Sequence, residues 1–239
     1  MDPREVAREF AAELRPALGD RPASVVLHGS VVRGEWVEGV SDINVLVLVD
    51  DISGASLAAI APVVRSYASR RVHPIIIEQS EWRSASDVFG IELVEMQDWH
   101  ELLAGPDPLM GLLVSPANLR IQAERELRGK LLQLHLGMVM AETPEKLGAL
   151  LAAALPSLTT FFRTALRLAR RDVTRESERT IRDGCALVGT SPEAILRVQG
   201  ARRGRQPLAV SLADPLVDAY NSAAERLAVY IDNAGEVRT

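Results

Sequence analysis

The sequence predicts an α/β domain with a small mixed sheet, followed by an all-helical bundle. Short runs rich in Val and Ile, each bounded by turn residues, occur at 24–28, 43–49 and 72–78. From about residue 115 the apolar residues recur at helical spacing instead. The charge changes at the same place, because residues 1–114 carry 18 acidic and 9 basic residues whereas residues 115–239 carry 14 and 18. We therefore expect two domains, 1–114 and 115–239.

The composition of the 239 residues argues against several classes of protein. Hydrophobic residues make up 47% of the chain without any apolar run near 18 residues, so neither a disordered protein nor a membrane protein is expected. The first 14 residues resemble an amphipathic helix rather than a signal peptide, which predicts a cytoplasmic location. The single cysteine, Cys185, excludes an internal disulfide and a cysteine-based zinc site. A net charge of −5 argues against general nucleic-acid binding.

The apolar runs of the first half are expected to occupy different positions in the sheet. Residues 43–49, INVLVLV, are so continuously apolar that both faces should be covered, which indicates a central strand. Pro74 suits an edge strand or a strand start, because proline donates no ladder hydrogen bond. Helices are expected at 54–69, from Glu81, and over 87–105.

The second half predicts helices throughout, with the clearest loop at 200–207. The expected helices lie at about 116–141, 144–155, 157–171, 174–188, 191–199 and 212–233. Arginines cluster on two of them, Arg163, Arg167, Arg170 and Arg171 on one and Arg120, Arg125 and Arg128 on another. We interpret both clusters as solvated faces with helix ion pairs, and contact with a triphosphate is the alternative.

The candidate residues for binding phosphate and a cation lie mainly in residues 25–50, VVLHGSVVRGEWVEGVSDINVLVLVD. A strand that ends in Gly29 and Ser30 and runs into a helix presents free backbone N–H groups, and the glycine lets a phosphate come close. Eleven residues separate Ser30 from Asp42, enough to bring the next strand beside this turn. A carboxylate there could hold a divalent cation against phosphate oxygens. Arg33, one turn further on, is a candidate phosphate contact.

These residues resemble the polymerase beta-like nucleotidyltransferase superfamily, and within it the small bacterial enzymes that adenylylate aminoglycosides. The signature is an apolar residue, Gly, and Gly or Ser, then a gap, then Asp, any residue, and Asp or Glu. LHGS at 27–30 and DINV at 42–45 match it except at Asn44, where the family has a second carboxylate. The stretch 87–109 is also similar to one common in uncharacterised bacterial members.

The resemblance implies metal-dependent transfer of a nucleoside monophosphate from a nucleoside triphosphate, with ATP expected, to an unknown hydroxyl or amine acceptor. Gly29, Ser30 and Arg33 would bind the nucleotide. Asp42 and Asn44 would hold Mg²⁺ or Mn²⁺, and Asp42 and Glu78 are the candidate catalytic residues, with Glu78 as the base. In the adenylylating enzymes a helical bundle closes over the substrates, so we expect the site in a cleft between the halves.

Asn44 leaves a second function open, a catalytically degraded member of this fold that acts as a nucleotide-binding or protein-interaction module. An amide oxygen can ligate Mg²⁺ but brings no negative charge. Each candidate also has a structural interpretation, with Asp42 ending a loop, Glu78 solvated, Arg33 exposed and His28 in the core. The four histidines show no metal-ligand spacing. The expected partners are a nucleotide and a small-molecule or macromolecular acceptor, with no membrane and no strong nucleic-acid signal.

Overall fold

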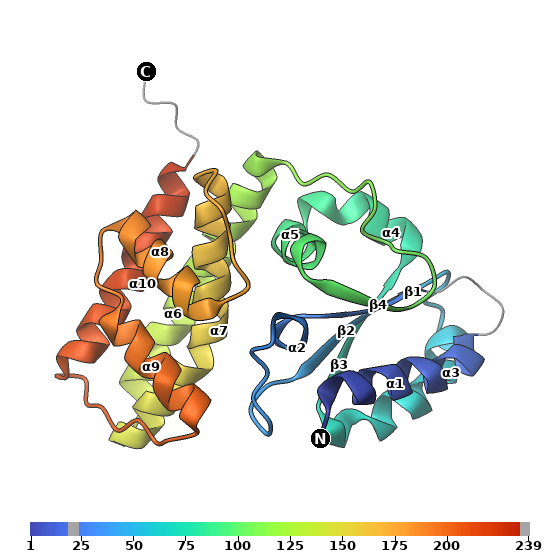
Figure 1. Cartoon of the computed structure of the whole chain (residues 1–239), viewed down its shortest axis with the longest axis horizontal. Helices are drawn as coiled ribbons and strands as arrows, with labels where there is room; N and C mark the ends of the chain where they lie inside the picture. The colour runs from blue at the N-terminus through green and yellow to red at the C-terminus, as the bar shows by residue number, and fades with distance from the viewer. Residues whose placement is uncertain (19–23, 235–239) are drawn as a thin grey trace. The chain divides into compact units, whose positions relative to one another are not determined.

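The computed structural model describes residues 1–18 and 24–234, and the chain divides into two compact units, Met1–Ser115 and Pro116–Thr239 (Figure 1). The first unit contains a small mixed sheet with helices, and the second is helical. The predicted fold class is therefore confirmed.

The sheet of the first unit has four strands in the order β3-β2-β1-β4. Their bounds are Ser24–His28 for β1, Ile43–Val49 for β2, Val72–Glu78 for β3 and His100–Ala104 for β4. β2 runs parallel to β3, whereas β1 runs antiparallel to both β2 and β4. The apolar run INVLVLV thus forms an interior strand and the strand with Pro74 lies at an edge, as predicted.

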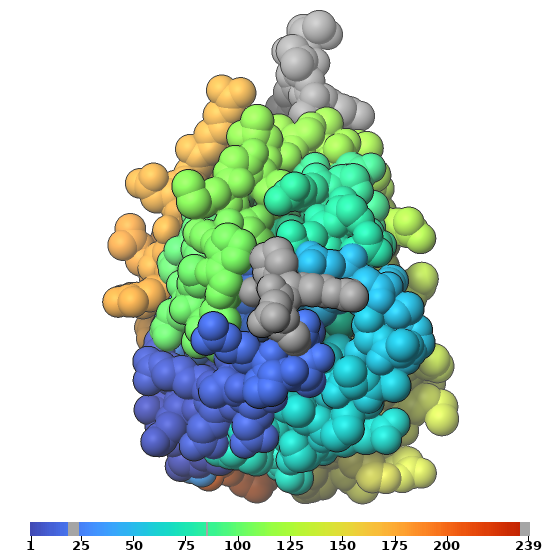
Figure 2. Space-filling view, turned by 90° about the vertical axis from the view of Figure 1, so that its right-hand side faces the viewer, coloured from blue at the N-terminus to red at the C-terminus, as the bar shows by residue number. Residues whose placement is uncertain are grey.

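Helices cover both faces of this sheet because its strands alternate two apolar faces. On one face, Val45 and Val47 pack with α1 (Pro3–Leu18) and α3 (Gly54–Ser66) in one core cluster. Figure 2 shows α1 in blue and α3 in cyan side by side on the surface. On the other face, Leu46 and Leu48 pack with α4 (Gln79–Ser84) and α5 (Gly90–Asp98). By the same alternation Asn44 belongs to the α4/α5 face.

The helix predicted over 87–105 is wrong in its second half. A short 3₁₀ turn, η2 (Ala85–Asp87), and α5 occupy the first part of this stretch, and β4 occupies the last. The sequence of β4, HELLA, contains good helix formers, but the strand pairs with β1 and covers an edge that would otherwise expose unpaired backbone groups. Tertiary pairing overrides the local preference here.

The second unit consists of helices in its described residues, 116–234. They are α6 (Pro116–Met140), α7 (Pro144–Leu168), α8 (Ser177–Val188), α9 (Glu193–Gly204) and α10 (Pro215–Asn233). α7 continues through Pro156, where two helices were predicted, because Leu155 and Leu158 on either side are buried in the bundle. That packing offsets a proline cost of about 3 kcal/mol. The predicted loop at 200–207 begins later, since α9 reaches Gly204.

The helix α7 is long and apolar enough to cross a membrane by length and composition. However, 56% of its most apolar window is buried. It packs against α6, α8, α9 and α10, and the side chain of Arg163 lies in its buried part. We interpret α7 as the core helix of the bundle.

Candidate functional site

The turn after β1 lies against the side chain of Asn44. Gly29 has φ 77°, in the left-handed region where a side chain is strained. A Cβ at this position would lie 2.7 Å from Asn44 Nδ2, so the close approach also requires glycine. The antiparallel register pairs His28 directly with Asn44. The predicted phosphate turn and the position of the missing carboxylate are therefore in contact.

A row of polar residues crosses the four strands at this end of the sheet. The register places His73 beside Asn44, Asn44 beside His28, and His28 beside His100. Neighbouring strands lie about 4.8 Å apart, so three of the four histidines of the chain come close together. The spacing of the histidines along the chain does not predict this row, because they come from three different strands. The pairing of β2 with β3 is the signal that would have placed His73 next to Asn44.

Asp42 lies just before β2 and forms an ion pair with Arg71. Arg71 Nη2 lies 2.6 Å from Asp42 Oδ1. The guanidinium also donates from Nη2 to the carbonyl of Val40 at 3.0 Å and from Nε to the carbonyl of Ser41 at 3.4 Å. His73 Nε2 lies 3.6 Å from the same Asp42 oxygen. Arg71 and His73 are thus the neighbours of Asp42, and the sequence analysis had assigned a role to neither.

Glu78 does not lie at this site, so its predicted role as the base is wrong. Because β2 and β3 are parallel, the residues that begin both strands share one edge, and Glu78 pairs with Val49 at the opposite end. The length of the strand separates it from Asp42 by about 20 Å, at about 3.3 Å per residue. Glu78 instead accepts a hydrogen bond from Ser80 Oγ, immediately after the strand. The β3 residue beside Asn44 is His73.

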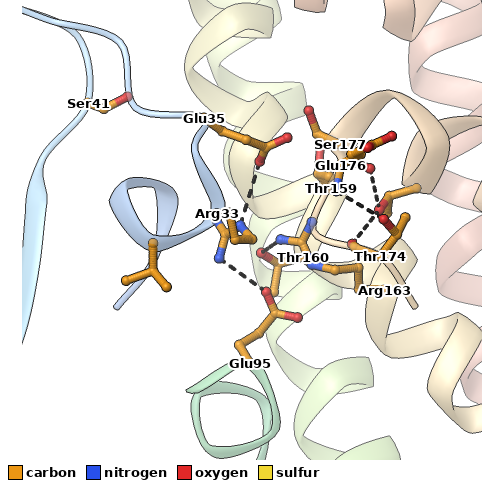
Figure 3. Close-up of polar contacts among 12 residues, drawn as sticks. Arg33, Glu35, Ser41, Glu95, Thr159, Thr160, Arg163, Thr174, Glu176 and Ser177 are labelled. Carbon is orange, nitrogen blue, oxygen red and sulfur yellow. Dashed lines mark hydrogen bonds and ion pairs between the residues drawn. The ribbon is translucent and has the colours of Figure 1, made fainter. Parts of the chain in front are cut away.

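Arg33 faces two carboxylates rather than an open turn. Its Nε lies 3.6 Å from Glu35 Oε2 and its Nη1 lies 3.5 Å from Glu95 Oε2, as Figure 3 shows. The three side chains are 11–14% exposed, so this is a largely buried ion-pair cluster. It connects α2 (Ser30–Arg33) to α5. The predicted role of Arg33 as a phosphate contact would require this cluster to open.

The arginines of the second unit also have partners within it. Arg163, predicted to lie on a solvated face, is 1% exposed, and its Nη2 lies 3.3 Å from Thr160 Oγ1 (Figure 3). Arg120 and Arg128 both pair with Glu124, as predicted for helix ion pairs. Ion pairs within the bundle thus account for Arg120 and Arg128, whereas Arg163 lies buried rather than on a solvated face.

His28 is held in its neutral form. Its Nε2 is buried without a hydrogen-bond partner among the described residues. Burial and, second, the charge of Arg33 lower the pKa of His28 from 6.5 to about 4. Desolvation disfavours the imidazolium, so His28 is neutral at pH 7. The structural interpretation of His28 as a core histidine agrees with this environment.

The donor set does not fit a two-metal centre. Such a centre needs bridging carboxylates, whereas Asp42, Asn44 and His73 offer one carboxylate, one amide and one imidazole. In the part of the chain that the structure describes, no group of three or more His, Cys, Asp or Glu is arranged to hold a metal ion. Asp42 Oδ1 is buried against Arg71, so a cation could reach that oxygen only by displacing the guanidinium.

Comparisons with known proteins agree with the fold. Residues 6–110 match the family model of the nucleotidyltransferase domain. A crystal structure of the spectinomycin adenyltransferase AAD(9) from Enterococcus faecialis with ATP and spectinomycin is similar, with a TM-score of 0.61 and 16% identity. The match covers 96% of this chain and 99% of that one. No curated protein in the comparison matches the chain.

The first unit thus matches the nucleotidyltransferase domain over residues 6–110, in agreement with the resemblance that its sequence predicted. The matched segment contains the turn at Gly29, the Asp42–Arg71 pair and the row of polar residues. The family match supports nucleotidyl transfer as the general chemistry of such domains. At 16% identity the structural likeness shows the fold alone.

Proposed function

We propose that the chain binds a nucleoside triphosphate, with ATP preferred, at the turn formed by Gly29 and Ser30. The observation that carries this proposal is the contact between the Gly29 backbone and Asn44 inside the segment matched by the nucleotidyltransferase family. The close approach keeps the turn free of a side chain, as a phosphate-binding turn requires. ATP in the structure of the similar adenyltransferase supports the choice of nucleotide.

The second candidate is metal-dependent transfer of a nucleoside monophosphate to a hydroxyl or amine of a small molecule. Asp42 and Asn44, two residues apart beside the Gly29 turn, would be the ligands of Mg²⁺ or Mn²⁺. Spectinomycin in the similar structure supports a small-molecule acceptor. We rank this candidate second because the Asp42, Asn44 and His73 positions supply a single carboxylate. A cytoplasmic location remains a prediction from the sequence.

Binding at the turn is tested by placing a negative charge on it. Ser30→Glu should abolish ATP binding in titration calorimetry, because the carboxylate repels the phosphates while remaining acceptable at a helix start. Ser30→Gln, which has a similar shape and no charge, should bind ATP within about threefold of wild type. Equal binding by Ser30→Glu and wild type would show that the nucleotide site lies elsewhere.

Transfer is tested separately by pyrophosphate release from ATP with aminoglycoside and aminocyclitol acceptors, in Mg²⁺ and in Mn²⁺. The first-ranked function predicts release near the no-enzyme background. Acceptor-dependent release that disappears in Asp42→Ala would establish the second candidate instead.

A further inference from the structure

We propose that Arg71 takes the place of the divalent cation, so that this chain binds the triphosphate without metal. The inference rests on the proposed function, because it concerns how the same turn accepts a polyanion. Its basis is the position of the guanidinium on Asp42 Oδ1, with a separation of 2.6 Å.

The backbone holds Arg71 in this place. Arg71 has φ 61° and ψ 32°, a left-handed conformation that is uncommon for a residue with a side chain. Its carbonyl accepts a hydrogen bond from Ile43 N at 2.8 Å, and its own N–H donates to the Ala68 carbonyl at 3.0 Å. The start of β2 and the residue that covers Asp42 are therefore fixed to each other. A non-glycine residue in this conformation costs about 1 kcal/mol or more, which the surrounding contacts offset.

The guanidinium retains donors for a phosphate. Arginine has five N–H donors in a planar fork. Nε and Nη2 face Ser41, Val40 and Asp42, whereas Nη1 makes no hydrogen bond to a described residue. The side chain of Arg71 is 44% exposed, and we assign the phosphate contact to Nη1. Two N–H groups on one nitrogen are suited to phosphate oxygens, and charge-assisted bonds of this kind are strong.

The charge of the site supports the same conclusion. If positions 42, 44 and 73 all carried carboxylates, they would repel a triphosphate unless cations lay between the carboxylates and the phosphates. Here positions 44 and 73 carry an amide and an imidazole, and Arg71 balances the charge of Asp42. At these positions the polyanion therefore meets no excess negative charge. His73 and His28 lie two strand spacings apart, about 10 Å, so the Arg71 end of the row and the Gly29 turn are close enough for one triphosphate chain.

The experiment measures ATP affinity by titration calorimetry in EDTA and in excess Mg²⁺, for wild type, Arg71→Gln and Arg70→Gln. Arg70 is the matched control, because it pairs with Glu9 at 2.6 Å and lies over Tyr67 rather than on Asp42. Wild type and Arg70→Gln should bind ATP in EDTA within about threefold of their affinity in Mg²⁺. Arg71→Gln should bind about tenfold more weakly in EDTA, the size expected for a lost charged hydrogen bond.

Magnesium distinguishes a phosphate contact from a purely structural role. Without Arg71, Asp42 becomes available to a cation, so Mg²⁺ should restore at least part of the ATP affinity of Arg71→Gln. A variant weakened only because its 40–42 loop has moved would not recover. Wild type that binds ATP only with Mg²⁺ would overturn this inference and leave the proposed function intact, and so would equal affinities of the two variants in EDTA. No binding by wild type in either buffer would overturn both.

Discussion

The backbone of Gly29 and the side chain of Asn44 occupy adjoining space, such that a Cβ at position 29 would come within 2.7 Å of Asn44 Nδ2. Because Asn44 is one residue into β2 and His28 is its register partner, neither backbone can withdraw without breaking the sheet. The turn and the amide are therefore energetically coupled.

Gly29→Ala should cost more stability than Gly111→Ala. Both positions have φ 77°, which strains a side chain, and Gly29 also has ψ −147°, near a region open almost only to glycine, where a strain of about 1–3 kcal/mol is expected. A Cβ at 111 meets nothing within 4 Å. We expect Gly29→Ala to lose a further ~1 kcal/mol, because Asn44 must move. Urea unfolding measures both free energies.

A double-mutant cycle checks the cause. Asn44→Ala should recover most of the extra loss of Gly29→Ala and leave Gly111→Ala unchanged. Additive effects at positions 29 and 44 would mean that Asn44 does not fill the space beside the turn.

Glycine also sets the packing of the helical unit. A Cβ on Gly148 in α7 would lie 1.6 Å from the carbonyl oxygen of Leu208, a backbone atom that cannot turn aside. Gly148→Ala should therefore lower the unfolding free energy by about 3 kcal/mol or more. Gly129→Ala in α6, where a Cβ meets nothing within 4 Å, should raise it by about 0.5–1 kcal/mol. Thermal unfolding should move in opposite directions for the two variants, and the same sign for both would contradict the packing described here.

The sequence predicted the elements whose signal is local. The runs at 24–28, 43–49 and 72–78 coincide with the bounds of β1, β2 and β3, because β-branched residues and flanking turns mark a strand by themselves. β4 has no such signal, since HELLA is stabilised as a strand by its pairing with β1. The helix break predicted at Pro156 is also wrong, because burial of the neighbouring residues keeps α7 continuous.

The site was predictable only where its residues are close in sequence. Gly29, Ser30, Asp42 and Asn44 belong to one loop and its two strands, so their association followed from the gap length. Arg71 immediately precedes β3 and His73 lies in it, and their place depends on the parallel register of β2 and β3, which no local pattern encodes. The prediction for Glu78 placed the residue on the correct strand but at the wrong end, because the starts of parallel strands share an edge.

His28 should make the free energy of unfolding depend on pH. Its pKa is about 4 in the folded chain and about 6.5 when unfolded, so the unfolded state takes up the proton first as the pH falls. The associated stability is present above pH 6.5 and is lost as the pH falls towards 4, by at most about 3 kcal/mol at about 1.4 kcal/mol per pKa unit. His28→Asn should flatten this part of the profile in urea unfolding at a series of pH values. Parallel profiles for wild type and variant would show that another group causes the loss.

The last prediction concerns carboxylates added at positions 44 and 73. Asn44→Asp combined with His73→Glu adds two carboxylates beside Asp42, at positions that the register places side by side. Without metal the three like charges should repel each other and lower the melting temperature. Mg²⁺ or Mn²⁺ should then raise it, because a ligand that binds only the folded state stabilises it by about 2.7 kcal/mol at a hundredfold excess over the dissociation constant.

Two controls assign this response to the site. Adding Asp42→Ala to the double variant should remove the metal response, whereas adding Glu78→Gln should leave it, because Glu78 lies at the opposite end of β3. Wild type, in which Arg71 pairs with Asp42, should respond little to either ion.

If wild type is stabilised by Mg²⁺ and loses that stabilisation in Asp42→Ala, then Asn44 is a working ligand, and metal-dependent nucleotidyl transfer becomes the first-ranked function. If neither ion raises the melting temperature of the double variant, positions 42, 44 and 73 are not arranged to bind a cation together.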